Sequence, residues 1–154
     1  MLIHETLVRE RCFHGVPGNS KKRVLERISE MIAEQTPDLD AEDIFSGLIG
    51  RERLGSTGIG EGIAIPHCRL ENCRNSVGAL VRLQEAVDFD AIDGQAVDML
   101  FVLLVPEEAT EAHLQILAAL AEMFSQADVR ERLRLTESAD ELYKAAVDYD
   151  MEQI

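Results

Sequence analysis

The chain has 154 residues, enough for one domain with a substantial core, and its composition of 46% hydrophobic and 29% charged residues is that of an ordinary globular protein. Its formal net charge is −14, from 29 acidic and 15 basic residues, which argues against nucleic-acid binding because that function needs a basic surface. The longest apolar run, 99–105, is far shorter than the roughly 20 residues of a membrane span, and the N-terminus lacks the pattern of a signal peptide.

Two helices are predicted in the first third of the chain. Ser20 is a suitable N-cap for a helix over 20–35, which Thr36 and Pro37 end because proline disfavours a helical predecessor. A second helix is expected to begin at Asp40 and to end at Gly55 in a left-handed cap. The apolar residues that recur at three- and four-residue spacing predict the buried faces of both: Val24, Leu25, Ile28, Met31 and Ile32, then Ile44, Phe45, Leu48 and Ile49.

Three strands are predicted where the hydrophobic period changes. Residues 63–65, 77–83 and 97–105 are short apolar or β-branched runs bounded by turn residues. The last run is apolar on both faces from Met99 to Val105, so we expect it in the middle of a sheet that is covered on both sides. Pro106 ends it.

Helices return in the last third. One is expected from a Thr110 cap to about Gln126, and two more near 128–135 and 139–148, the latter opening with the capping-box pattern of Ser138 to Glu141. The predicted buried stripe of the first is Leu114, Leu117, Leu120, Ala121 and Phe124. Helices, then strands, then helices predict a single-domain α/β sandwich over 1–154, with a central, largely buried mixed sheet and helices on both faces.

The glycine-rich stretch 55–67, GSTGIGEGIAIPH, does not fit the known nucleotide-binding loops. Gly55 and Gly60 have P-loop spacing, but Glu61 stands where the phosphate-binding lysine is required. The dinucleotide fingerprint also fails, because the glycines alternate and a strand-like run follows. A nucleotide site is therefore disfavoured.

The stretch ends at His67, directly after Pro66. A proline interrupts strand pairing, so His67 is expected at a rigid, exposed strand end. An imidazole is largely neutral and nucleophilic near pH 7, and the glycines would let backbone N–H groups approach an anion beside it. The alternative is a histidine that merely ends a strand in solvent.

A family resemblance favours the nucleophile. Residues 51–67, RERLGSTGIGEGIAIPH, resemble the active-site signature of the enzyme IIA proteins of the fructose–mannitol class, from the bacterial phosphoenolpyruvate-dependent phosphotransferase system. The long GSTGIG form and the helix beginning SKKR most resemble the nitrogen-related, regulatory branch, although Cys68 stands where the family usually has glycine. The likeness extends to 20–26, 89–94, 103–106 and 112–115.

The resemblance implies roles for two histidines. His67 would be the phosphorylated nucleophile, and His113 matches the second histidine of the family's site. On the predicted helix, His113 shares a face with Leu117 and Leu120, so it could meet His67 at the strand ends. From the residues alone a surface histidine in a capping turn is the favoured interpretation of His113, and the resemblance reverses that order.

Charged candidates surround them. Arg51 matches the family's active-site arginine, whose guanidinium would meet the charge on a transferring phosphoryl group, although an arginine ending a helix also serves as a solvated dipole partner. Glu61 could orient the imidazole or a bound water, or could be a solvated loop acid. Arg53 and Arg69 are further candidates without motif support.

The three cysteines predict neither disulfides nor a metal centre. Their odd number suits a reducing, cytoplasmic compartment. Cys68 and Cys73 have a C-x4-C spacing beside His67, but a zinc site usually has a second such pair. No cofactor or metal is expected.

The resemblance implies a phosphotransferase with a transient phosphohistidine, and the composition predicts that it is cytoplasmic. By the resemblance, it accepts a phosphoryl group from an HPr-type phosphocarrier and regulates partners such as potassium-transport or sensor proteins in nitrogen metabolism. The alternative within the family is a sugar-specific enzyme IIA of sugar transport that passes phosphate to a cysteine of an enzyme IIB domain. A pure interaction module is a third possibility, which an intact His67, His113 and Arg51 argue against.

Overall fold

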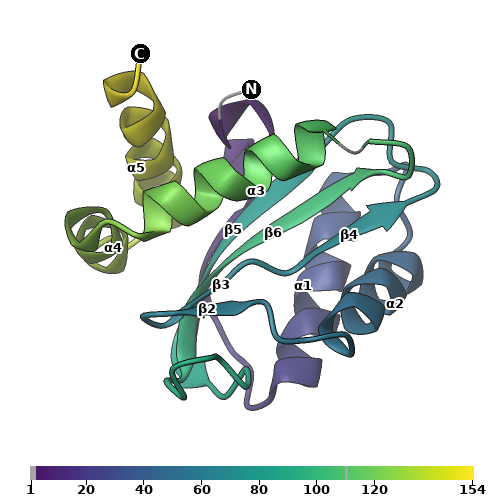
Figure 1. The fold of residues 1–154 in the computed structure, drawn as a ribbon, viewed down its shortest axis with the longest axis horizontal. Helices are drawn as coiled ribbons and strands as arrows, with labels where there is room; N and C mark the ends of the chain where they lie inside the picture. Colours follow the sequence, from purple (N-terminus) through teal and green to yellow (C-terminus); the bar gives the residue numbers. More distant parts are fainter. Residues whose placement is uncertain (1–2, 110) are drawn as a thin grey trace.

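A mixed sheet of six strands forms the middle layer of the computed structural model, which describes residues 3–109 and 111–154 (Figure 1). Helices cover both faces of this sheet, so the predicted α/β sandwich is confirmed. The strands are β1 (Cys12–Val16), β2 (Gly58–Gly60), β3 (Ile63–Ala64), β4 (His67–Leu70), β5 (Val77–Val87) and β6 (Val97–Pro106).

Strand β6 lies at the centre, as its apolar sequence predicts. It pairs antiparallel with β5 on one side and parallel with both β3 and β4 on the other. Beyond these, β1 pairs parallel with β5, and β2 pairs antiparallel with β3 at the opposite edge. Every residue from Met99 to Val105 is buried, because helices cover β6 on both faces.

The α1 (Lys21–Gln35) and α2 (Ala41–Glu52) pair covers one face. Ser20 and Asp40 cap these helices by accepting hydrogen bonds from the N–H groups of Arg23 and Asp43 (both 3.2 Å), so both predicted starts are confirmed. The predicted end of α2 is wrong. The helix ends at Glu52, and Gly55 has φ +158°, an extended rather than a left-handed conformation.

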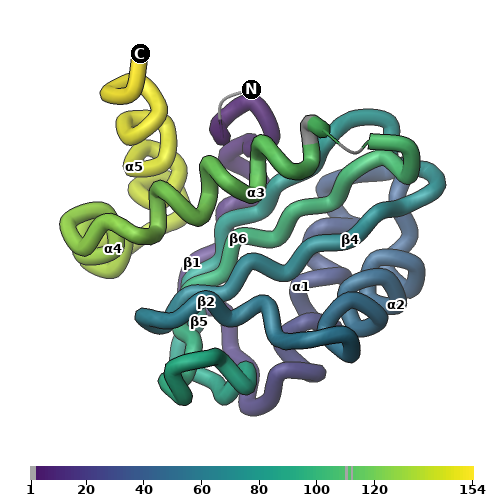
Figure 2. The backbone as a smooth tube through the Cα atoms, viewed as in Figure 1, coloured from purple at the N-terminus to yellow at the C-terminus, as the bar shows by residue number. Residues whose placement is uncertain are grey.

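The other face is covered by the N-terminal turn and three C-terminal helices. These are η1 (Ile3–Glu5), followed by η2 (Arg9–Arg11), and then α3 (Glu111–Phe124), α4 (Ala127–Arg134) and α5 (Ala139–Glu152). Figure 2 shows the N-terminal turn beside α3 and α5. Ile3 of this turn belongs to the buried cluster that these helices form with the sheet. Ser138 caps α5 as predicted, by accepting from the N–H of Glu141 (3.2 Å). The predicted Thr110 cap lies outside the described residues.

Helix α3 is rotated relative to the predicted stripe. Leu114 is 66% exposed and Ala121 is exposed, whereas Leu117 is partly buried and Leu120 and Phe124 are buried as expected. The residues that face the sheet are His113, Ile116, Leu120, Met123 and Phe124. Leu114 and Ala121 are seven residues apart and share a helical phase that turns both of them away from the sheet.

Three strands were not anticipated. β2 and β4 are very short, and β1, which reads CFHGV, contains no clear apolar alternation.

Within the described residues, no helix combines the length and the hydrophobicity that a bilayer crossing would need.

Candidate functional site

The link between β3 and β4 sets the position of His67. The Leu103 N–H of β6 donates to the Pro66 carbonyl (2.9 Å), and His67 then begins β4 in register with Leu103. Its side chain is only partly exposed. The prediction of an exposed strand end is therefore wrong: only Ile65 and Pro66 lie outside a strand, and the chain then pairs again with β6.

The imidazole of His67 is held by its own backbone. Its Nδ1 lies 2.8 Å from the carbonyl oxygen of Ile65. Because a carbonyl can only accept a hydrogen bond, Nδ1 carries the proton and a neutral ring has its lone pair on Nε2. The sequence contained no signal for this bond, which depends on the bend at Pro66.

His113 comes to the same place from α3. It is buried, with 8% of its surface exposed, and its ring centroid lies 5.2 Å from that of His67 with the two planes tilted by 51°. The meeting of the two imidazoles that the helical face predicted is thus observed. Among the described residues, Nδ1 of His113 has no hydrogen-bond partner, so the ring has unused hydrogen-bonding capacity.

Both histidines are shifted toward the neutral form. Burial is the main cause that lowers the pKa of His67; the charge of Arg51 lowers it further, while the bond to Ile65 and the charge of Glu52 act in the opposite direction. Burial also lowers the pKa of His113, followed by the nearby His67 and Arg69. The lowered pKa values favour the uncharged form of both rings near neutral pH.

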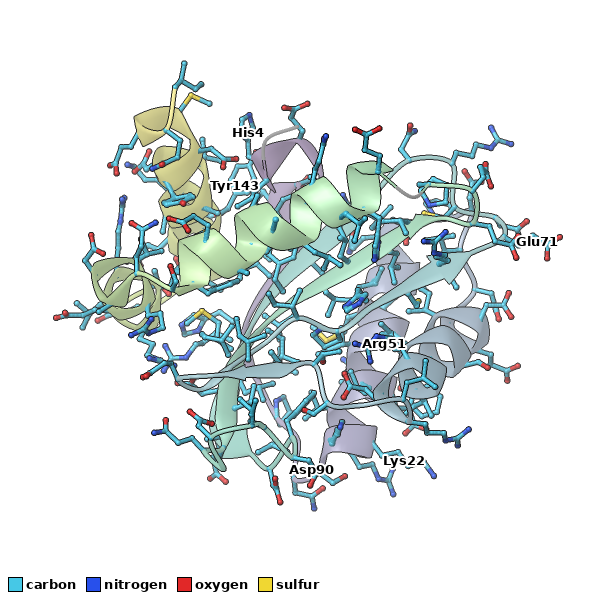
Figure 3. All side chains as sticks on the ribbon, viewed as in Figure 1. His4, Lys22, Arg51, Glu71, Asp90 and Tyr143 are labelled. Atoms are coloured by element: carbon cyan, nitrogen blue, oxygen red, sulfur yellow. The ribbon has the colours of Figure 1, made fainter. Side chains whose placement is uncertain are left out.

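Of the three arginine candidates, two have defined places near the imidazoles. Arg51, in the last turn of α2, donates from Nη1 to the carbonyl of Gly55 (2.8 Å), and its charge acts on His67 (Figure 3). Arg69 of β4 is exposed, donates to the carbonyl of Glu107 (3.0 Å), and its charge acts on His113. Arg53 is exposed at the end of α2. A guanidinium has five N–H donors, so Arg51 keeps others for a ligand.

Glu61 lies elsewhere. Its side chain, 65% exposed, occupies the turn between β2 and β3, and its carboxylate lies 3.8 Å from the guanidinium of Arg130 on α4. Its backbone N–H donates to Asp93 (2.9 Å) and its carbonyl accepts from Arg134 (2.5 Å). These contacts favour the solvated loop acid over a partner of the imidazole.

The flanking glycines serve the same turn. Gly60 and Gly62 have φ of +100° and +78°. A Cβ on Gly62 would lie 2.6 Å from a guanidinium nitrogen of Arg134 and 2.9 Å from the carboxylate of Asp98. The two glycines therefore let the hairpin turn tightly against this ion pair, and the approach of backbone N–H groups to an anion beside His67 stays a prediction.

Two of the three cysteines, Cys68 and Cys73, lie on the face of the sheet opposite to α3 and His113. Cys68 and Cys73 belong to the core cluster under α1 and α2, and burial raises the pKa of Cys68 to about 12. Gly47 of α2 makes room for Cys68, since a Cβ there would lie 2.8 Å from its Sγ. No group of three metal-binding side chains gathers in residues 3–109 or 111–154.

Comparisons with known proteins match this architecture. Residues 6–147 match the family described as the phosphoenolpyruvate-dependent sugar phosphotransferase system, EIIA 2. The chain belongs to this family. A nitrogen regulatory protein of Pseudomonas aeruginosa is 53% identical over 146 residues, 95% of either chain.

A solved structure and a sugar-specific relative extend the comparison. The crystal structure of nitrogen regulatory protein IIA-Ntr from Neisseria meningitidis has a TM-score of 0.86 at 41% identity, covering 94% of this chain and 98% of that one. The fructose-specific EIIA component of Haloferax volcanii is 35% identical over 122 residues, 79% of either chain. This enzyme IIA chain is thus similar to both regulatory and sugar-specific members.

Proposed function

We propose that this enzyme IIA chain accepts a phosphoryl group on Nε2 of His67 from an HPr-type phosphocarrier. The observation that carries the proposal is the bond from His67 Nδ1 to the Ile65 carbonyl, because it leaves Nε2 as the nucleophilic nitrogen. The lowered pKa of His67 keeps that nitrogen unprotonated near neutral pH. The whole chain, 1–154, would act as one IIA domain in the cytoplasm.

The transfer exchanges one phosphorus–nitrogen bond for another. The Nε2 lone pair forms a bond to phosphorus in line with the bond that breaks on the carrier's imidazole, which recovers its electron pair. The His67 ring becomes more positive as the bond forms. Its Nδ1 proton already points at the Ile65 carbonyl, which stabilises that charge.

His113 and Arg51 would stabilise the moving phosphoryl group. The ring of His113 lies next to that of His67, with 5.2 Å between the centroids. His113 is in the first turn of α3, where the positive end of the helix dipole also favours an anion. Arg51 would add guanidinium N–H donors and positive charge from the end of α2. Catalysis then consists of positioning and charge stabilisation.

The regulatory output would be binding of partners that discriminate between the phosphorylated and unphosphorylated forms. The nitrogen regulatory relative at 53% identity supports this branch. A specific observation also favours a second candidate: the 35% identical fructose-specific component supports relay of the phosphate to an enzyme IIB cysteine.

Incubation with phosphoenolpyruvate, enzyme I and an HPr-type carrier tests the proposal. We expect a mass gain of one phosphate that is labile to acid and stable to base, and no gain in the His67→Ala variant. Absence of any gain in the folded wild-type chain would contradict phosphotransfer. Adding enzyme IIB domains to the phosphorylated chain distinguishes the two candidates. Only a sugar-specific enzyme IIA would transfer its phosphate to a cysteine of an enzyme IIB domain.

A further inference from the structure

A buried carboxylate lies directly beside Arg51 in the sequence. The Glu52 side chain is 4% exposed at the end of α2. Its Oε2 lies 2.7 Å from Nζ of Lys21 and accepts from the Thr57 N–H (3.2 Å), while its Oε1 accepts from the Thr57 hydroxyl. A buried charge is costly unless it is paired in this way, so these contacts are a built feature of the site.

Lys21 sits where a helix does not favour a lysine. It is the first residue of α1, whose first turn contains no acidic residue, and the positive end of a helix dipole disfavours a cation. Its ammonium is instead held by Glu52, and it also donates to the Phe89 carbonyl (3.4 Å) and lies 5.4 Å from the centre of the Phe89 ring. Lys21 thereby ties α1, the end of α2 and the segment after β5 together.

A continuous path leads from this ion pair to His67. The Thr57 carbonyl accepts from the N–H of Ile65 (3.0 Å), and the Ile65 carbonyl accepts from Nδ1 of His67 (2.8 Å). On the far side, the Pro66 carbonyl is fixed by Leu103 of β6 (2.9 Å). The Ile65 carbonyl is thus oriented from two sides, by Thr57 and by β6.

We infer that Glu52, held by Lys21, is a positioning residue that acts through Thr57 to aim the Ile65 carbonyl and so fix the Nδ1–H tautomer of His67. The inference deepens the proposed function and rests on His67 as its nucleophile. Glu52 does not act as an acid or base itself, because both of its oxygens are buried and occupied by donors. The inference also gives a structural role to the SKKR stretch at 20–23, through Lys21, and to Phe89, which contacts Lys21.

The tautomer of His67 can be measured directly by imidazole ¹⁵N chemical shifts in the unphosphorylated chain. We expect wild-type His67 to be the Nδ1–H form. Thr57→Val keeps the size of the side chain but removes the hydroxyl bond to Glu52, whereas Thr57→Ser retains it. We expect the Nε2–H form to appear in Thr57→Val but not in Thr57→Ser, with phosphorylation slowed about 10-fold in the former, the effect of one lost bond to a charged group.

The ion pair is tested by the double variant Lys21→Met/Glu52→Gln, which leaves no unpaired buried charge, with Lys22→Met as its control. Lys22 is the exposed neighbour of Lys21 (Figure 3). We expect the Nε2–H form in the double variant and the wild-type spectrum in Lys22→Met. Unchanged His67 shifts in both Thr57→Val and the double variant would overturn the inference, even if either variant loses thermal stability.

The ¹⁵N spectra are recorded on the unphosphorylated chain. The positioning role of Glu52 can therefore be tested independently of the proposed phosphotransfer. Failure of phosphorylation with a variant-sensitive tautomer would remove the proposed function and leave the positioning path supported. Normal phosphorylation with the same His67 tautomer in every variant would support the proposed function and contradict the positioning role of Glu52.

Discussion

At the scale of single residues, the proposed reactivity of His67 depends on which of its ring nitrogens carries a proton. The helical phase of His113 allowed the two imidazoles to meet, but the family resemblance was needed to favour that prediction over a surface histidine. The parts that define their state were not predictable. The Ile65 carbonyl is a backbone group, and Lys21 and Glu52 are 31 positions apart and resemble any other surface charges until the fold buries them.

His113→Ala should slow phosphorylation without preventing it. His113 would stabilise the transferring group but forms no bond to phosphorus, and loss of one such donor costs about 10²–10³ in rate. Single-turnover phosphorylation by the carrier measures the effect. A wild-type rate would reduce His113 to a buried packing residue.

Arg51→Gln should raise the pKa of His67. The positive charge of Arg51 is one cause of the lowered value, and its removal leaves burial, the larger cause, so the pKa rises only part of the way to that of an ordinary histidine. Loss of protonation on His67 would then occur at higher pH, and the neutral, reactive form would begin to decline sooner on acidification. An NMR pH titration of the His67 ring gives both values; an unchanged or lower pKa in the variant would contradict the electrostatic role.

At the scale of elements, the sequence predicts helices by their caps more reliably than strands by their pattern. Ser20, Asp40 and Ser138 begin helices as predicted, because each cap is a local interaction. β4 could not be found in this way, since its four residues are a strand only through pairing with β6. Residues 99–105 were the exception, because a continuous apolar run itself indicates a central strand.

The contact between α2 and β4 gives a test at this scale. Cys68 packs against Gly47, where an added Cβ would lie 2.8 Å from its sulfur. We expect Gly47→Ala to lower the free energy of unfolding by about 1–3 kcal/mol, the cost of overpacking. In a Cys68→Ala background the same change should cost less, because the sulfur is gone and alanine favours a helix over glycine, although Leu70 Cδ2 would still lie 3.3 Å from the added Cβ. Urea unfolding of the four proteins measures the coupling, and additive effects would show that the contact is not tight.

At the scale of the whole molecule, the site joins the two helical layers. His67 starts a strand in the middle layer, Arg51 comes from α2 on one face, and His113 from α3 on the other. Phosphate on His67 would therefore add negative charge where the two helical layers meet the sheet.

Phosphorylation should weaken binding of a regulatory partner that docks acidic or apolar groups on this region. It adds roughly two negative charges to a chain whose formal net charge is already −14. We expect a coupling of about 1–3 kcal/mol, or about 5–150-fold in affinity, partly reproduced by His67→Glu. Titration of one partner against both forms at two salt concentrations measures it. Equal affinities would instead favour relay of phosphate to enzyme IIB.

The most direct test of the central claim is the position of the phosphate on the phosphorylated chain. Long-range ¹H–¹⁵N and ¹H–³¹P NMR correlations distinguish the ring nitrogens of each histidine, with the His67→Ala variant as the control for assignment. We predict one phosphate, on Nε2 of His67, with the proton retained on Nδ1. Phosphate on Nδ1 of His67, or on His113 in the wild-type chain, would contradict the account.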